Sequence, residues 1–129
     1  MLGTAADLLA QAQDHVYDAW ETNDARKQIA LARKALTISP HCADAYVVLA
    51  GHTERGSKEE LELWQRGHQV GRDCLGTAGF EQWAGEFWLR LETRPYLRAR
   101  LGLACALWER GHKLGAIGTH PVRAALLAD

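Results

Sequence analysis

Apolar residues recur at every third or fourth position along most of the chain, which is the spacing of amphipathic α-helices. The first such segment follows candidate caps at Thr4 and Asp7. It carries Leu8, Leu9, Ala12, Val16, Ala19 and Trp20. Apolar–polar alternation of period two is not sustained anywhere, and only three prolines interrupt the chain. The pattern therefore predicts an all-α protein with about six helices.

Breaks in this periodicity mark the boundaries of the first four predicted helices. Thr22-Asn23-Asp24 ends the first, with Asn23 suited to a left-handed conformation and Asp24 to capping the next helix. The second ends at Ser39-Pro40, because the residue before proline disfavours helical geometry. The third begins within residues 41–44. The fourth follows Ser57, which has Glu60 three residues later, the spacing of a capping box.

Glycines and a proline shape the second half of the chain. Gly67 and Gly71 lie inside the fourth predicted helix, where they weaken it but allow a neighbouring helix to approach closely. Residues 76–79 predict a turn, and residues 80–94 predict a short aromatic helix that Pro95 ends or bends. A sixth helix is predicted over residues 96–110. The periodicity of residues 114–129 is broken by further glycines and Pro121.

A five-residue pattern occurs twice, 55 residues apart. Glu54-Arg55-Gly56-Ser57-Lys58 and Glu109-Arg110-Gly111-His112-Lys113 each follow a Leu-Ala step by a few residues. We interpret each copy as a helix end, with the basic residue in the last turn and the glycine as a left-handed cap. Recurring helix–turn–helix units predict a stacked array, whose usual role is to hold another molecule.

Several residues resemble the positions that define the tetratricopeptide repeat, a helix pair of about 34 residues. Asn23 falls at the turn, Ala35-Leu36 at the small-then-large step and Pro40 at the closing proline. In the last unit, Leu103-Ala104, Leu107, Gly111 and Ala116 match the spacing. Gln28 departs from the small residue of the family, and Pro121 falls where the family has helix. Two longer stretches are also similar to a bacterial subgroup of tetratricopeptide proteins related to the suppressor-of-tumorigenicity family. They are residues 31–36 through 44–46, and residues 87–96.

The length of the chain predicts one domain, residues 1–129. The resemblance implies that this domain is built as an α-α superhelix of antiparallel helix pairs. Its units would span about residues 5–40 and 41–76, followed by an insertion helix at 80–94 and a partial unit at 96–127. The implied function is a non-catalytic adaptor or scaffold that binds a protein or peptide in a groove lined by the first helix of each pair. The chief alternative is a structural homo-oligomer formed through the incomplete terminal repeat, and a small enzyme ranks third.

The candidate binding residues are aromatic and arginine side chains on the predicted groove helices. They are Tyr17, Tyr46, Trp88, Arg94, Tyr96, Arg98 and Arg100. Arginine forks suit bidentate capture of carboxylate or phosphate, and Trp88 is the expected exposed aromatic contact. The alternative is that the arginines pair with internal acids such as Glu86 and Glu92, or are simply solvated. The other four tryptophans fall on helical stripes, which predicts that they lie in the core.

Charge and chemistry narrow the class of function. The net charge of −1 lacks the basic footprint of a nucleic-acid binder, and no apolar run reaches the length of a membrane span. Three widely spaced cysteines favour a reducing compartment, so the expected location is cytoplasmic. Metal-ligand pairs, a nucleophile motif and a phosphate loop are absent, which argues against an enzyme, a metal or another cofactor.

The two ends of the chain differ in charge. Residues 1–24 carry five carboxylates and no lysine or arginine, whereas basic residues dominate 90–113. This asymmetry fits two solvated faces, an acidic partner on the basic end, or head-to-tail contact between copies.

Overall fold

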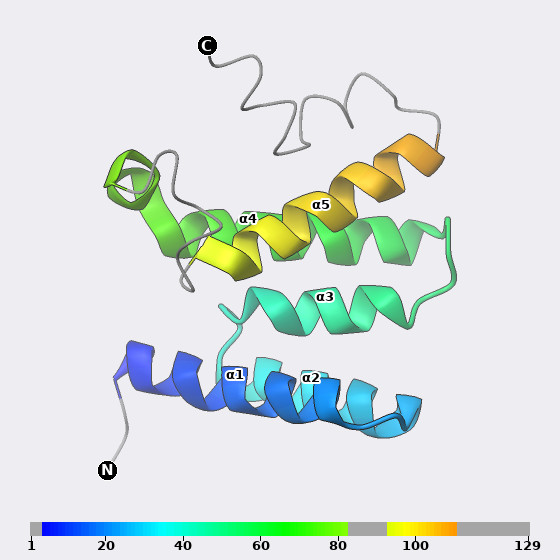
Figure 1. Cartoon of the computed structure of the whole chain (residues 1–129), viewed down its shortest axis with the longest axis horizontal. Coiled ribbons are helices and arrows are strands. Elements are labelled where there is room, and N and C mark those ends of the chain that lie inside the picture. Colours follow the sequence, from blue (N-terminus) through cyan, green and yellow to red (C-terminus); the bar gives the residue numbers. More distant parts are fainter. Residues whose placement is uncertain (1–3, 83–92, 111–129) are drawn as a thin grey trace.

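The computed structural model describes residues 4–82 and 93–110, and these residues form five α-helices (Figure 1). The helices are α1 (Ala5–Glu21), α2 (Ala25–Ile38), α3 (Ala43–Gly51), α4 (Lys58–Gln82) and α5 (Arg94–Glu109). No strand occurs within the described residues, so the predicted all-α class is confirmed.

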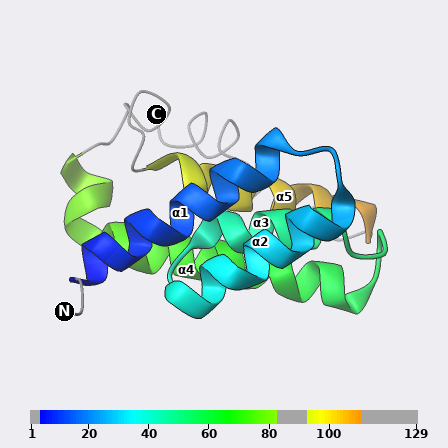
Figure 2. The same cartoon turned by 90° about the horizontal axis from the view of Figure 1, so that it is seen from below.

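The helices form two layers, as the two views in Figures 1 and 2 show. Helices α1, α3 and α5 lie in one layer, and α2 and α4 lie behind them. Each helix packs against the next one along the chain, and α3 also packs against α1 and α5. The central helix α3 therefore contacts all four of the other described helices.

Side-chain caps begin three of the helices where the sequence predicted them. The Thr4 hydroxyl accepts a hydrogen bond from the Asp7 N–H at 3.1 Å, and the Asp7 carboxylate accepts one from the Thr4 N–H at 3.2 Å. Asp24 accepts from the first turn of α2, and the Ser57 hydroxyl accepts from the Glu60 N–H at 3.1 Å. Asn23 does not adopt the left-handed conformation that asparagine tolerates, since no described non-glycine residue has a positive φ.

Small side chains fill the contact between the first three helices. Ala12, Val16, Ala32, Ala35 and Ala45 are fully buried there. Nearly every side chain of α3 is buried as well, which is typical of a helix that is apolar all round. Alanines at these positions allow the helix axes to lie close together, so the tight stacking follows from residue size.

Gln28, which stands where the tetratricopeptide repeat has a small residue, forms hydrogen bonds to two other segments. Its Nε2 donates to the Thr22 carbonyl at 2.6 Å, and its Oε1 lies 2.6 Å from His52 Nε2. The longer side chain thus connects the α1–α2 turn to the end of α3.

Glycines allow α4 to pack closely on its neighbours, as predicted. A Cβ at Gly67 would lie 3.2 Å from the Tyr46 Cβ, and one at Gly71 would lie 2.9 Å from the Tyr96 Cα. A Cβ at Gly102 of α5 would overlap the Trp64 ring. Because a methyl group would meet backbone or a packed ring at Gly71 and Gly102, the α4–α5 contact requires glycine there.

The predicted turn at residues 76–79 is reduced to one non-helical residue. Gly76 has φ 63° and ψ 175°, after which α4 resumes to Gln82 at a different angle (Figure 1). Residues 80–82 of the predicted aromatic helix therefore belong to α4, and the remainder up to residue 92 lies outside the described residues. Helix α5 begins at Arg94, with Pro95 in its first turn, where proline is tolerated because its N–H would have no helical partner.

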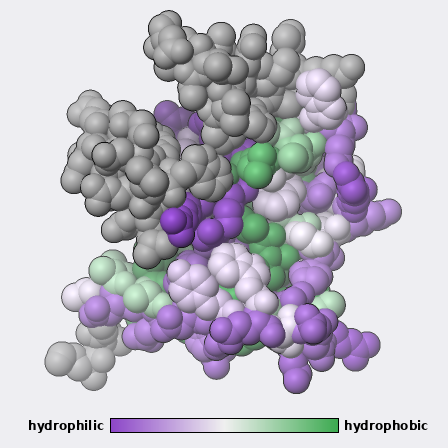
Figure 3. All heavy atoms as spheres, in the orientation of Figure 1, coloured by the Kyte–Doolittle hydropathy of each residue, from purple (hydrophilic) through white to green (hydrophobic). Residues whose placement is uncertain are grey.

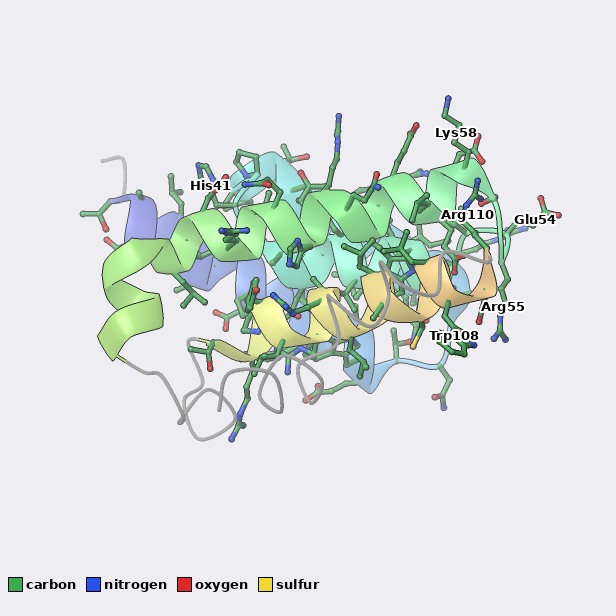
Figure 4. The ribbon with its side chains drawn as sticks, turned by 90° about the horizontal axis from the view of Figure 1, so that it is seen from above. His41, Glu54, Arg55, Lys58, Trp108 and Arg110 are labelled. Carbon is green, nitrogen blue, oxygen red and sulfur yellow. The ribbon has the colours of Figure 1, made fainter. Side chains whose placement is uncertain are left out.

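The two Glu-Arg-Gly copies contact each other at one end of the molecule (Figure 4). Arg55 donates from Nε to Glu109 Oε2 at 3.0 Å, and Arg110 Nη1 donates to the Gly56 carbonyl at 2.8 Å. The hydrogen bond and charge of Arg55 lower the pKa of Glu109. The α3–α4 turn is thereby joined to the end of α5.

The structure corrects our interpretation of these copies as equivalent helix ends. Helix α3 ends at Gly51, so Arg55 lies outside its last turn. Gly56 does adopt a left-handed conformation, with φ 84°, but in the turn that precedes α4. Arg110 is the C-cap residue of α5, and Gly111 lies outside the described residues.

A candidate binding groove between α1 and α5

The candidate site is the face on which α1 and α5 lie on either side of α3, and we call this face the groove. We define it by five side chains: Tyr17 and Trp20 of α1, Val47 of α3, and Leu101 and Trp108 of α5. Within the described residues, Tyr17, Trp20, Leu101 and Trp108 are the large apolar side chains that are most exposed, each between 40% and 51%. Figure 3 shows this face, with apolar surface at its centre and hydrophilic surface along the α1–α2 edge.

The α5 side of the groove is built from residues at helical spacing. Arg98, Leu101, Cys105 and Trp108 recur at every third or fourth position on the exposed side of α5. Figure 4 shows Trp108 on the side of α5 that is turned away from α4. Beside this stripe, a hollow of about 490 Å³ is lined by Val47, Leu101 and Cys105, among others.

Arg98 connects the two walls of the groove to its floor. Its Nε donates to Asp44 Oδ1 at 2.8 Å and its Nη2 donates to Asp44 Oδ2 at 2.6 Å. Gln13 of α1 donates to the same Oδ2 at 2.8 Å. The Arg98 guanidinium carbon also lies 5.0 Å from the centre of the Trp20 ring, within cation–π range. One arginine of α5 therefore contacts α1 and α3 together.

Burial decides the role of this ion pair. Asp44 is fully buried, while a third of the Arg98 side chain remains exposed. Burial acts to lower the pKa of Arg98, but the hydrogen bond and negative charge of Asp44 outweigh it and raise the pKa. A buried carboxylate without this partner would be strongly unfavourable, so Arg98 is a structural residue of the groove.

The remaining predicted site residues divide between groove and interior. Tyr17 lies on the groove, with its ring 5.8 Å from that of Trp20. Tyr46 and Tyr96 are 9% and 3% exposed, so their side chains pack between helices and do not offer the surface that we expected. Arg100 donates to the Tyr96 hydroxyl. Arg94 is half-buried in the first turn of α5, and Trp88 lies outside the described residues.

The sequence did not identify three residues of this face: Trp20, Trp108 and Asp44. Trp20 and Trp108 were predicted to be core, but both are exposed because they fall at the edge of the apolar stripe of their helices. Asp44 was read only as part of a helix start. Its signal was a carboxylate within the apolar stretch of residues 42–50, a placement that requires a buried partner. The arginine–glutamate pairs expected with Glu86 and Glu92 fall on residues that the structure leaves undescribed.

A second hollow, of about 520 Å³, opens beside the groove near Tyr17. Leu9, Gln13, Leu75 and Tyr96 contribute to its lining, together with Cys74. Burial raises the pKa of the Cys74 thiol. The raised pKa makes the Cys74 thiol a weaker nucleophile, because the thiolate is the reactive form.

His68 is the titratable group of α4 that faces the α4–α5 contact. The centre of its ring lies 5.2 Å from the centre of the Tyr96 ring, with the two planes tilted by 32°, and its Nε2 is buried without a hydrogen-bond partner among the described residues. Burial lowers the pKa of His68, and the positive charges of Arg100 and Arg72 lower it further. The neutral imidazole is therefore favoured in the folded protein.

Comparison with known protein families, with characterised proteins and with solved structures found no match. In residues 4–82 and 93–110, no three His, Cys, Asp or Glu side chains gather where they could hold a metal ion. None of the described helices is both long enough and apolar enough to cross a lipid bilayer.

Proposed function

We propose that this protein is a non-catalytic interaction module that binds a protein or peptide segment in the groove between α1 and α5. The proposal takes the fold as a short stack similar to tetratricopeptide repeats. Helices α1 and α2 would form the first pair, α3 and α4 the second, and α5 would begin a third. The layered order of the helices and the contacts of α3 with both α1 and α5 support this assignment.

One observation carries the functional proposal. The strongly exposed large apolar side chains of the described residues all lie on α1 and α5, the walls of the groove. By contrast, Arg26, Lys27, Arg33 and Lys34 are exposed on α2, in the opposite layer. Apolar side chains gathered on one face and absent from the opposite one are typical of a surface that another molecule covers.

Arg98 is a poor position at which to test binding by substitution. Replacing Arg98 would leave Asp44 buried and unpaired, so lost binding could reflect lost folding. Tyr17 and Leu101 are better positions, because both are exposed and neither has a described hydrogen bond.

Site-specific photocrosslinking in cells that express the protein tests the proposal. A benzoylphenylalanine placed at Tyr17 or at Leu101 reports on the groove. The same residue at Ala30, which is exposed on α2, is the matched control. We expect discrete crosslinked products from the two groove positions and none from the control.

The products separate the alternatives. Crosslinks between two copies of this chain would favour the structural homo-oligomer. Equal products from the groove and from α2 would contradict the proposed function.

A further inference from the structure

Exposed carboxylates border the groove on its α1 side. Asp14 and Glu21 lie three residues before and four residues after Tyr17, so all three share one side of the helix. Asp18 lies four residues after Asp14 and three residues before Glu21, so it neighbours both on the helix surface. The three carboxylate residues Asp14, Asp18 and Glu21 are all exposed. Within residues 4–82 and 93–110, no lysine or arginine forms an ion pair with them.

The position of these carboxylates is unfavourable for α1 itself. Asp18 and Glu21 occupy its last turn, where the helix dipole favours basic residues, and that turn contains none. Local charges that oppose helix stability are expected where another molecule supplies the compensating charge.

The arginine that the structure places against α1 does not balance them. Arg98, which lies over the Trp20 ring, forms its ion pair with the buried Asp44 carboxylate. Asp14, Asp18 and Glu21 are therefore exposed carboxylates without an ion-pair partner among the described residues, and they lie on the same helix as the exposed rings of Tyr17 and Trp20.

Resting on the proposed function, we propose that the groove binds a basic peptide segment in which lysine or arginine side chains neighbour bulky apolar ones. The apolar side chains contact Trp20, Leu101 and the hollow beside them. The cationic side chains pair with Asp14, Asp18 and Glu21 and lie over the Tyr17 ring, where a cation is attracted to the aromatic face. This partner has the opposite charge to the acidic one suggested by the sequence alone.

Phage display of random 12-residue peptides on the purified full chain tests this partner class. Selections run in parallel on the wild type, on Asp14→Asn/Asp18→Asn/Glu21→Gln, and on Glu54→Gln/Glu59→Gln/Glu62→Gln. The last variant removes the same number of exposed carboxylates from the α3–α4 turn and α4. A fourth selection, on Tyr17→Ala/Leu101→Ala, tests the groove, and circular dichroism confirms that each variant is folded.

We expect the wild type and the α4 control to enrich the same lysine- and arginine-rich apolar peptides. For the best peptide, fluorescence anisotropy should show binding that is about tenfold weaker in the α1 variant. Binding to the wild type should also weaken more than binding to that variant as sodium chloride is raised from ~50 to ~500 mM, because salt screens exposed charges.

The other outcomes overturn one proposal or both. Neutral or acidic peptides that depend on Tyr17 and Leu101 would overturn the basic partner while leaving the groove function intact. Basic peptides that bind the α1 variant equally well would also overturn it. Failure to enrich any groove-dependent peptide would count against the proposed function itself.

Discussion

Arg98 of α5 and Asp44 of α3 form a bidentate ion pair whose carboxylate is completely buried. The pair lies beneath the groove, and Trp20 of α1 packs over the guanidinium. Helices α1, α3 and α5 are not consecutive in the sequence, and all three meet at this one arginine. The stability of the groove should depend on this pair more than on any exposed ion pair of the described residues.

We expect Arg98→Met to lower the free energy of unfolding by about 2–4 kcal/mol, because it leaves a buried carboxylate without its charge partner. The lower part of the range allows for the exposed third of the arginine side chain. Urea denaturation followed by circular dichroism measures the change.

Two controls decide whether the loss belongs to the pair. Arg26→Met, at an exposed position of α2, should change the free energy of unfolding by less than about 0.5 kcal/mol. The double variant Asp44→Ala/Arg98→Met should be more stable than the sum of the two single losses predicts. Additive losses would show that the two residues do not stabilise each other.

Gly71→Ala should destabilise the protein by about 1–3 kcal/mol, because the new methyl group would lie 2.9 Å from the Tyr96 Cα and force α4 away from α5. Gly51→Ala is the matched control, since a Cβ there meets nothing within 4 Å and alanine favours a helix. Thermal unfolding of both variants compares them. An equal effect at the two positions would contradict the close α4–α5 contact.

The free energy of unfolding should decrease as the pH falls through the ordinary His68 pKa of 6.5. The folded protein lowers the pKa of His68, so in this window the unfolded chain binds the proton more readily and is favoured by acid. The loss should level off below the lowered pKa of the folded state. Urea denaturation between about pH 7.5 and pH 5 should show a smaller decrease for His68→Phe than for the wild type. Parallel curves would rule out this role for His68.

The Cys42 and Cys105 thiols should react at rates set by their burial. Cys42 is fully buried, and burial raises its pKa to about 11, whereas Cys105 is exposed on α5. We expect Ellman's reagent at about pH 8 to modify Cys105 first and Cys42 at least roughly a hundredfold more slowly. Mass spectrometry of Cys42→Ala and Cys105→Ala assigns each phase. Denaturant should abolish the difference, and rapid labelling of Cys42 in the folded protein would contradict its place in the core.

Local sequence was sufficient to predict the helices and several of their boundaries. Thr4, Asp24 and Ser57 cap helices where their side chains suggested, because a cap depends on hydrogen bonds within one turn. The close packing at Gly67 and Gly71 was also predictable, since few other reasons favour glycine inside a helix.

The candidate site was predicted less well, because exposure depends on what packs against each side of a helix. Tyr17 is exposed on α1, whereas Tyr46 and Tyr96 are buried and Trp20 and Trp108 are exposed. Periodicity identifies an apolar stripe, but it does not show how wide a stripe the neighbouring helices will cover.

The sequence by itself determined that the chain is helical, where most described helices begin, and which glycines permit close packing, because these properties arise within a few residues or from side-chain size. Only the tertiary structure decided that Arg98 pairs with Asp44, and that Arg55 pairs with Glu109, since each pair joins residues 54 positions apart. It also decided which aromatic rings remain exposed beside the carboxylates of α1. Those choices depend on how the helices stack, and no single helix carries that information.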